Sequence, residues 1–429
     1  MKLLQWYAQR DPAYIRQRAV ALRERYGITP VKAIRRVTNC VALLAEYGCA
    51  PTFPTPGRVV ERHPDWIRLL QERGAEIAVH GFDHVDLCAY PLEKGRQQLV
   101  RATAAFDRHG IEWRGFRCPY LGCPEDLPAL LPPGLFDYSS NRAIEWDASL
   151  PDGDGVKNQA VHEVLQRVYR PLSSRDAVSV PWSRAHIIEI PVTLPDDLTL
   201  HDGHQLGYEG LAEVWIRVLR ATHERGEMFV LMYHPELGEP CQRAFAAVLD
   251  EAARLRPGVW LARLRDISGW WREKDAFDAS ISSADASLNV SFACSDRATI
   301  LVKGLATAGS EPWDDVYRQL RARSLQVPAE PRPFLGLPAN APPHRVTFLR
   351  EQGYILDMGE TAPRCATYLD ATVLDRMASD VDLISLIEAS PGPLIRYWRW
   401  PDGARSVLSI TGDLDAVSLL DYTTRLFVR

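Results

Sequence analysis

The sequence lacks the features that mark membrane proteins, secreted disulfide scaffolds and nucleic-acid binders. It has no stretch of about 18 consecutive apolar residues, so no transmembrane helix is expected. The eight cysteines are scattered and form no CxxC pair, which is typical of free thiols in a reducing compartment. Lys and Arg total 50 against 55 Asp and Glu, a net charge of −5 that argues against nucleic acid as a partner.

The N-terminus carries no pattern typical of export. Its apolar stretch, "LLQWYA", is too short for a signal peptide, and Arg and Asp follow at once. We therefore expect a cytoplasmic protein. A chain of 429 residues is long for one compact domain, so two units, or one unit enlarged by an insertion, are expected.

Helical and strand-like patterns alternate in the first part of the chain. Apolar spacing of three and four predicts helices over 13–24, 31–47, 63–74, 92–110 and 208–226. Short apolar runs between them predict strands near 50–54, 76–79, 114–117, 135–139, 186–191 and 228–233. Strands separated by helices at this spacing indicate βαβ units, and hence a parallel sheet or barrel.

The pattern changes between residues 273 and 395. Apolar and polar residues alternate over 286–305, as in strands with one exposed face. This region is followed by "VPAEPRPFLGLPANAPPH", which we interpret as a proline-rich connection. Helix-led segments follow at 345–359 and 374–390. We expect a separate α+β module without internal repeats, and we find no catalytic constellation in it.

Polar side chains follow several of the predicted strands. They therefore lie at the carboxyl ends of the strands, where parallel sheets and barrels bind ligands. They are His80 and His84, four residues apart, then Arg117 and His234. A buried-type strand at 406–411 near the C-terminus is followed by two aspartates, Asp413 and Asp415.

Each of these residues also has a purely structural interpretation. Asp413 could cap the helix that follows it, Arg117 could form a structural ion pair, and His234 could be a satisfied core histidine. Residues 196–207, with His201 and His204, could form an exposed turn or could reach over the site. The coincidence of four such motifs at four strand ends favours a functional site.

These stretches resemble the polysaccharide deacetylases, the NodB-homology or family-four carbohydrate esterases. "VHGFDH" is similar to the histidine pair of that family, "RCPY" to its arginine motif, "APTFPTPG" to a family strand and "VLMYHPEL" to its closing histidine motif. The match runs over about 50–235 in the family's order. The resemblance implies an α/β fold, a distorted seven-stranded (β/α) barrel with a metal-dependent amide hydrolysis site.

The chain departs from the family at its first motif, an acidic pair on the first barrel strand. No such pair precedes residue 50, whereas "SITGDLDA" near the C-terminus is similar to a D-x-D form of it. If the strand 406–411 lies beside 50–54, the barrel regains its first strand and the count reaches seven. The expected organisation is a circular permutation: barrel residues 1–272, an α+β module at 273–395, and a returning strand and helix at 396–429.

The resemblance also assigns roles to the residues. His80, His84 and Asp415 would bind one divalent metal ion, Zn²⁺ or another transition metal. The catalytic residues would be Asp413 as general base, Arg117 holding its carboxylate, His234 as the acid that protonates the leaving amine, and Tyr120, whose backbone N–H would serve an oxyanion hole. For the acidic partner of the acid histidine, Asp147 and Asp176 are the candidates.

The expected activity is hydrolysis of the N-acetyl group of an amino sugar or glycan precursor. One alternative keeps the metal chemistry on a non-sugar amide or cyclic amide. Another is a catalytically inactive barrel that acts as a binding module. A homodimer in which the terminal strand completes the barrel of a second subunit also fits the sequence.

Overall fold

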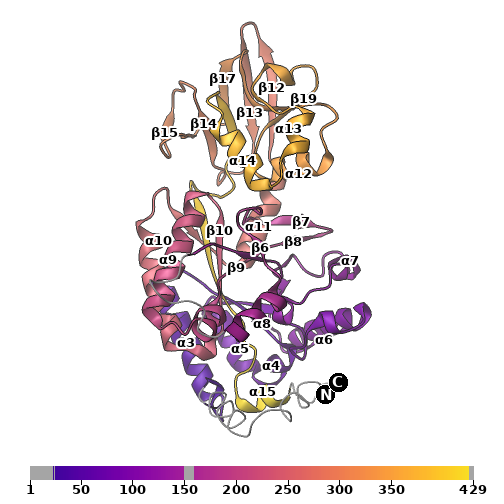
Figure 1. Cartoon of the computed structure of the whole chain (residues 1–429), viewed down its shortest axis with the longest axis vertical. Helices are drawn as coiled ribbons and strands as arrows, with labels where there is room; N and C mark the ends of the chain where they lie inside the picture. The colour runs from indigo at the N-terminus through magenta and orange to yellow at the C-terminus, as the bar shows by residue number, and fades with distance from the viewer. Residues whose placement is uncertain (1–22, 24, 149–158, 425–429) are drawn as a thin grey trace.

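The computed structural model describes residue 23 and residues 25–148 and 159–424. Figure 1 shows two units stacked along the long axis, with the first part of the chain and its C-terminal end in the lower one. No helix in the described ranges is long and apolar enough to cross a membrane. The helix predicted over 13–24 lies, apart from residue 23, outside the described residues.

A curled, mostly parallel sheet forms the centre of the lower unit. In spatial order, its main strands are β10 (Met228–Tyr233), β22 (Ser406–Gly412), β1 (Thr52–Thr55), β2 (Glu76–Val79), β3 (Gly115–Phe116), β4 (Tyr138–Ser139) and β8 (Ile187–Glu189). Smaller strands complete it: β5 (Ala143–Glu145), β6 (Leu172–Ser173), β7 (Trp182–Arg184), β9 (Val192–Leu194) and β11 (Val259–Leu261). The predicted α/β fold with a barrel-type sheet is confirmed.

One extended segment, residues 187–194, pairs with β4 through its first half and with β10 through its second half. Strands β8 and β9 are separated only by Ile190 and Pro191; β8 pairs with β4, whereas β9 pairs with β10. The sheet therefore curls into a distorted barrel, and the segment 187–194 acts as one strand of it. With that segment counted once, the barrel strands are the seven that the sequence predicted.

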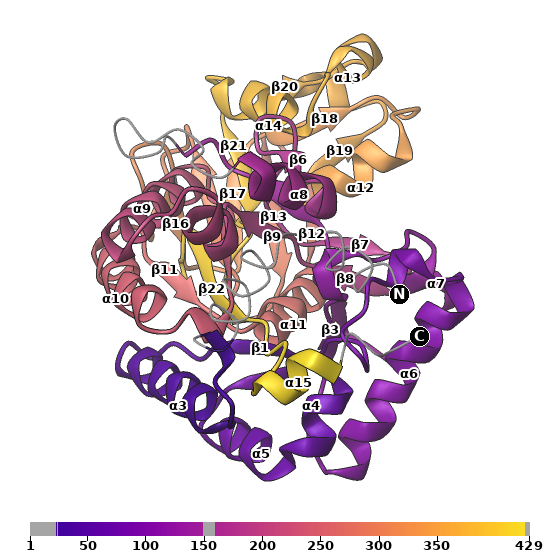
Figure 2. The ribbon, with the colours of Figure 1, turned by 60° about the horizontal axis from the view of Figure 1, so that its bottom comes forward.

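Strand β22 occupies the gap between β10 and β1. Six residue pairs, from Met228 with Val407 to Tyr233 with Gly412, align it parallel to β10, and Thr411 pairs with Thr52 of β1. All seven of its residues are buried, as expected for a central parallel strand covered on both faces. The prediction that 406–411 lies beside 50–54 is confirmed. In Figure 2, β22 (yellow) lies with β1 and β11 inside the ring of helices.

Helices cover the outside of the barrel sheet (Figure 2). The helices of this unit are α3 (Val31–Glu46), α4 (Gly57–Arg62), α5 (Pro64–Glu72), α6 (Leu92–Arg108), α7 (Leu127–Leu130), α8 (Gln159–Tyr169), α9 (Tyr208–Glu224), α10 (Glu239–Arg254), α11 (Leu264–Asp275) and α15 (Leu419–Thr424). Amphipathic spacing accounts for their packing: α3 buries Val37, Cys40, Val41 and Leu44 on one face.

The upper unit contains three small sheets. They are formed by β12 (Asp278–Ala284), β13 (Ser287–Ala293) and β17 (Ser324–Pro328); by β14 (Ile300–Lys303), β15 (Ser310–Pro312), β16 (Arg318–Leu320) and β21 (Leu394–Tyr397); and by β18 (Arg332–Leu337), β19 (Leu356–Met358) and β20 (Cys365–Tyr368). Its helices are α12 (Pro343–Glu351), α13 (Ala371–Arg376) and α14 (Asp380–Ala389). The helix-led segments at 345–359 and 374–390 are thus confirmed.

The proline-rich stretch after residue 326 is not a simple connection, so that prediction is wrong. Residues 332–337 form β18, the central strand of a parallel sheet with β19 and β20. Pro333 lies where the register between β18 and β20 shifts, so its missing N–H breaks no regular pair. The run Phe334 to Leu337 is fully buried, and this burial outweighs the weak strand preference of proline.

Candidate active site

Four strands bring polar side chains to one rim of the barrel. His80 follows β2, Arg117 follows β3, His234 follows β10 and Asp413 follows β22. Because parallel strands end at the same edge, residues more than 300 positions apart in the sequence meet there. The backbone N–H of Asp413 donates to the carbonyl of Tyr233, and that of Leu414 donates to Pro54, which fixes the end of β22 between its neighbours.

His80, His84 and Asp415 form one cluster at this rim. Their ligand atoms all lie within 4.8 Å of one another. Asp415 Oδ1 is 2.9 Å from His84 Nε2 and 3.4 Å from His80 Nε2. His80 and His84 are buried, whereas the Asp415 side chain keeps 11% of its surface exposed.

The turn that carries the histidines is held by its own surroundings. Gly81 and His84 both have positive φ angles, 66° and 45°, so the chain turns sharply between the two imidazoles. The Gln98 side chain of α6 accepts hydrogen bonds from the N–H groups of Phe82 and Asp83, and buried Asp83 forms an ion pair with Arg58 of α4. These contacts keep His84 over His80, with ring centroids 5.0 Å apart.

The tautomer of His80 suits a metal ligand. Its Nδ1 lies 2.9 Å from the carbonyl oxygen of Arg117, which can only accept, so Nδ1 carries the proton. The Nε2 lone pair then faces the Asp415 carboxylate. The Nε2 atom of His80 is buried and makes no hydrogen bond within the described part of the chain. Lone pairs that converge in this way repel one another unless a cation lies between them, so the residues fit a divalent metal ion.

Arg117 and Asp413 form a buried ion pair beside the cluster. Arg117 is fully buried, and its Nη1 donates to Asp413 Oδ1 at 2.7 Å and to Thr411 Oγ1 at 3.0 Å. Its other N–H groups donate to the carbonyl and hydroxyl oxygens of Ser140. The second Asp413 oxygen is 3.7 Å from His80 Nε2. Asp413 is not a helix cap, because α15 begins only at Leu419.

His234 is paired with an aspartate that the sequence analysis did not identify. Its Nδ1 donates to Asp197 Oδ1 at 2.9 Å, and its backbone N–H donates to Asp197 Oδ2. Burial lowers the pKa of His234, but the Asp197 carboxylate outweighs it and raises this pKa to about 10. The imidazole therefore holds a proton at neutral pH, as a general acid must.

The two suggested partners, Asp147 and Asp176, are therefore wrong. Asp147 forms an exposed ion pair with Arg175, whereas Asp197 follows β9, the strand next to β10. The available signal was the pair "DD" at 196–197, which follows the predicted strand 186–191 after four residues.

Residues 196–207 do not form an exposed turn. Residues 198–203 form one helical turn, and Asp196, Asp197, Leu200 and His204 are buried. Asp196 accepts hydrogen bonds from the Tyr169 hydroxyl and from Thr199. Burial, and next the charge of Asp197, raises the pKa of Asp196 to about 6.

Asp196, Asp197 and His234 also lie close enough together to hold a metal ion. However, the carboxylates already accept hydrogen bonds from Tyr169, Thr199 and His234. We therefore interpret this group as a hydrogen-bonded acid rather than a second metal centre.

Tyr120 lies at the surface beside His84. The residue is 46% exposed, and its ring meets the His84 ring edge-on, with centroids 4.9 Å apart. Tyr120 and Leu121 both have positive φ, 60° and 54°, a strained conformation that is frequent at functional sites. The assignment of its backbone N–H to an oxyanion hole stays a prediction, as do the catalytic and metal-binding roles of the other six residues.

A family model matches the part of the chain that carries four of these residues. Residues 33–131 match the family model described as polysaccharide deacetylase. This match includes His80, His84, Arg117 and Tyr120, whereas His234 and the C-terminal aspartates lie beyond it.

Several solved structures are similar to the chain. A protein described as a polysaccharide deacetylase from Mycobacterium smegmatis is 23% identical with a TM-score of 0.44, over 64% of this chain and 88% of that one. The peptidoglycan deacetylase PdaC from Bacillus subtilis is 12% identical with a TM-score of 0.34, over 56% of this chain and 87% of that one. An allantoinase is 18% identical with a TM-score of 0.42, over 56% and 72%. A search of curated protein sequences found no significant match.

Proposed function

We propose that this chain, whose residues 33–131 match the polysaccharide deacetylase family model, is a metal-dependent hydrolase of amide bonds. Its substrate would be an N-acetylated amino sugar or glycan precursor, from which it releases acetate. The observation that carries this proposal is the convergence of His80, His84 and Asp415 beside an arginine-bound carboxylate and a protonated histidine.

His80, His84 and Asp415 would hold the metal ion. Two nitrogen ligands and one oxygen ligand are typical of catalytic zinc sites, although other divalent transition metals accept the same set. When bound, such an ion lowers the pKa of water and polarises the substrate carbonyl. The backbone carbonyl of Arg117 supports the set, because it fixes the ring of His80 through Nδ1.

Asp413 would act as the general base. Its carboxylate lies next to the proposed metal ligands, since one oxygen is 3.7 Å from His80 Nε2. The other oxygen accepts a hydrogen bond from Arg117, which holds the group in one orientation. Asp413 could thus take a proton from a water molecule at the site without reorganising.

His234 would act as the general acid. It carries the proton at neutral pH because Asp197 stabilises the imidazolium, and it would transfer this proton to the amine as the amide C–N bond breaks. Base and acid thus come from neighbouring strands, β22 and β10.

We also propose that the chain is a circular permutation of the family barrel. β22 would supply the family's first strand and acidic motif, and the module at 273–395 would be inserted between the last and first strands. The parallel pairing of β22 with β10 and β1 of the same chain supports this proposal. The domain boundaries and the cytoplasmic location stay predictions.

A direct assay of substrates tests the proposed function. The metal-loaded chain should release acetate from N-acetylglucosamine derivatives, and Asp413→Asn should slow the release by about a hundredfold or more. Hydrolysis of allantoin-like cyclic amides alone would favour the alternative substrate class. If neither class is hydrolysed and metal analysis finds no bound ion, the proposal is overturned in favour of an inactive binding module.

Asp197→Asn is expected to move the alkaline limb of the pH profile. The wild-type enzyme should lose kcat/KM as His234 deprotonates near its pKa of about 10. Without the Asp197 charge, burial dominates and lowers the pKa of His234, so the loss of activity should begin at lower pH. The measurement is kcat/KM between pH 6 and 10.5.

The same residue pair should affect folding. The pKa of His234 is raised from its ordinary 6.5, so its stabilising contribution is full below pH 6.5 and is lost as the pH rises through about 10. The free energy of unfolding, measured with urea, should therefore fall more for wild type than for Asp197→Asn over this pH interval. Asp65→Asn, a change at an exposed aspartate, is the control for both measurements. An alkaline limb that Asp197→Asn leaves in place would contradict the assignment of His234.

A further inference from the structure

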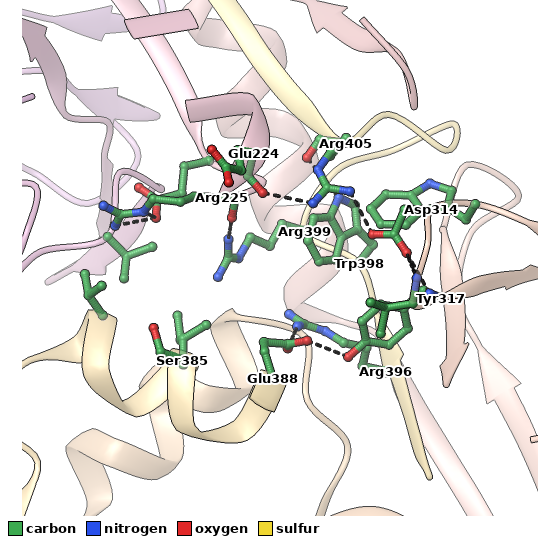
Figure 3. Close-up of a pocket in the computed structure, with 16 residues that line it drawn as sticks. Glu224, Arg225, Asp314, Tyr317, Ser385, Glu388, Arg396, Trp398, Arg399 and Arg405 are labelled. Carbon is green, nitrogen blue, oxygen red and sulfur yellow. Dashed lines mark hydrogen bonds and ion pairs between the residues drawn. The ribbon is translucent and has the colours of Figure 1, made fainter. Parts of the chain in front are cut away.

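A cavity lies where the upper unit meets the lower one, at the end of β10 and β22 that is opposite to the barrel rim. Its volume is 320 Å³, within the range of small-molecule sites. The end of α9, the helix α14 and the segment 396–405, which leads from β21 to β22, all contribute to its wall (Figure 3). The proposed catalytic residues take no part in it.

Four arginines and four carboxylates line this cavity, and most of them are paired. The ion pairs are Arg225 with Glu227, Arg396 with Glu388 and Arg405 with Asp314. Two charged residues remain, Arg399 and Glu224. Glu224 is on the exposed surface, so it does not balance a buried charge.

Arg399 is the exception among these arginines. It is 1% exposed, yet no carboxylate within the described ranges lies within ion-pair distance of it. Its Nη1 donates to the carbonyls of Arg225 and Gly226, at 3.0 and 3.1 Å, and its buried Nε has no hydrogen-bond partner. In Figure 3 its guanidinium points into the open space between Arg225, Ser385 and Glu388.

The electrostatics around Arg399 favour a bound anion. Burial, and next the charge of Arg396, lowers the pKa of Arg399 to about 10 against the smaller opposing effects of Glu227 and Glu388, so the group is still charged at neutral pH. A buried guanidinium that no carboxylate contacts directly is costly, and an anion with two oxygens could bind it through two parallel hydrogen bonds.

The remaining wall is apolar and aromatic. Val178, Val381, Ile384 and Trp398 line it, with the Trp398 ring centroid 5.5 Å from the Arg399 guanidinium carbon. Ser385 adds a hydroxyl group on the side of α14. Such a wall suits a ligand with a hydrocarbon or aromatic body beside its anionic group.

We propose that this cavity binds a small organic anion, a carboxylate or a phosphate ester, whose oxygens pair with Arg399. The apolar part of the ligand lies against Trp398 and Ile384. Occupation of the cavity would place an anion in direct contact with Arg399, which forms no ion pair with a carboxylate of the described residues.

Isothermal titration of the full chain tests this proposal with three probes of similar shape. Benzoate and phenyl phosphate carry the anion, and benzamide is the neutral counterpart. We expect at least one anion to bind with one site per chain and benzamide not to bind. Preference for benzoate indicates a carboxylate ligand, whereas preference for phenyl phosphate indicates a phosphate ester.

Two variants locate the binding to this cavity. Arg399→Gln should weaken binding of the anion about tenfold or more, because a charge-assisted hydrogen bond is lost. Ser385→Trp should block the cavity while it keeps Arg399, and it decides the question if Arg399→Gln fails to fold. Arg321→Gln, at an exposed arginine of the upper unit, should bind as wild type does. The proposal is overturned if neither anion binds wild type, or if Ser385→Trp binds as wild type does.

Discussion

Asp413→Asn is expected to lower kcat for amide hydrolysis by about 10²- to 10⁴-fold, the usual contribution of a general base. Asparagine keeps the shape of the side chain and can still accept the hydrogen bond from Arg117, but it cannot take a proton from water. Metal content should stay at the wild-type value, because Asp413 is not among the proposed ligands. The measurement combines steady-state kinetics with metal analysis of the same sample.

The loss of charge also tests the buried ion pair. Arg117 is fully buried, so without the carboxylate its charge is uncompensated and the variant should unfold at a lower temperature. Asp402→Asn, at an exposed aspartate paired with Arg297, is the matched control and should retain full activity. A folded Asp413→Asn variant with wild-type kcat would rule out Asp413 as the base.

His234→Gln is expected to lower kcat for acetamide substrates by a similar factor of about 10²- to 10⁴-fold. The reason is the leaving group, because an amine leaves from the tetrahedral intermediate only after it is protonated. An activated ester such as p-nitrophenyl acetate releases a stable anion and needs no such acid. The variant should therefore lose far less activity on the ester than on the amide.

This difference between ester and amide separates acid catalysis from a general loss of structure. A misfolded site would lose both activities together, as would a site that no longer bound its metal. His344→Gln, at an exposed histidine of α12, is the matched control. Equal losses on ester and amide in the His234→Gln variant would contradict the role of His234 as acid.

The strands of the barrel could be predicted from the sequence because they are short, apolar and bounded by helices. β22 is the clearest case: the run "SVLSIT" at 406–411 is typical of a buried strand, and the aspartates behind it mark the carboxyl end. Its place between β10 and β1 followed from the resemblance to a family that needs an acidic pair on the first strand. Apolar pattern alone does not determine which strands are neighbours.

Other features depended on three-dimensional packing and were missed. Asp197 reaches His234 because β9 and β10 are adjacent and parallel, a relation that single-sequence patterns do not contain. The polar segment 196–207 is buried because its carboxylates find donors in Tyr169, Thr199 and His234. Likewise, β18 is a strand in spite of its prolines, because its apolar residues fill the core of the upper unit.

The central claim is that the C-terminal aspartate and the histidine pair share one metal ion. Mass spectrometry of metal content on purified wild type and on Asp415→Ala tests it most directly, with Asp402→Asn as control. The account predicts about one transition-metal ion per chain in wild type and control, and loss of this ion in Asp415→Ala. Wild type without metal, or a folded Asp415→Ala variant that retains the full amount, would contradict it.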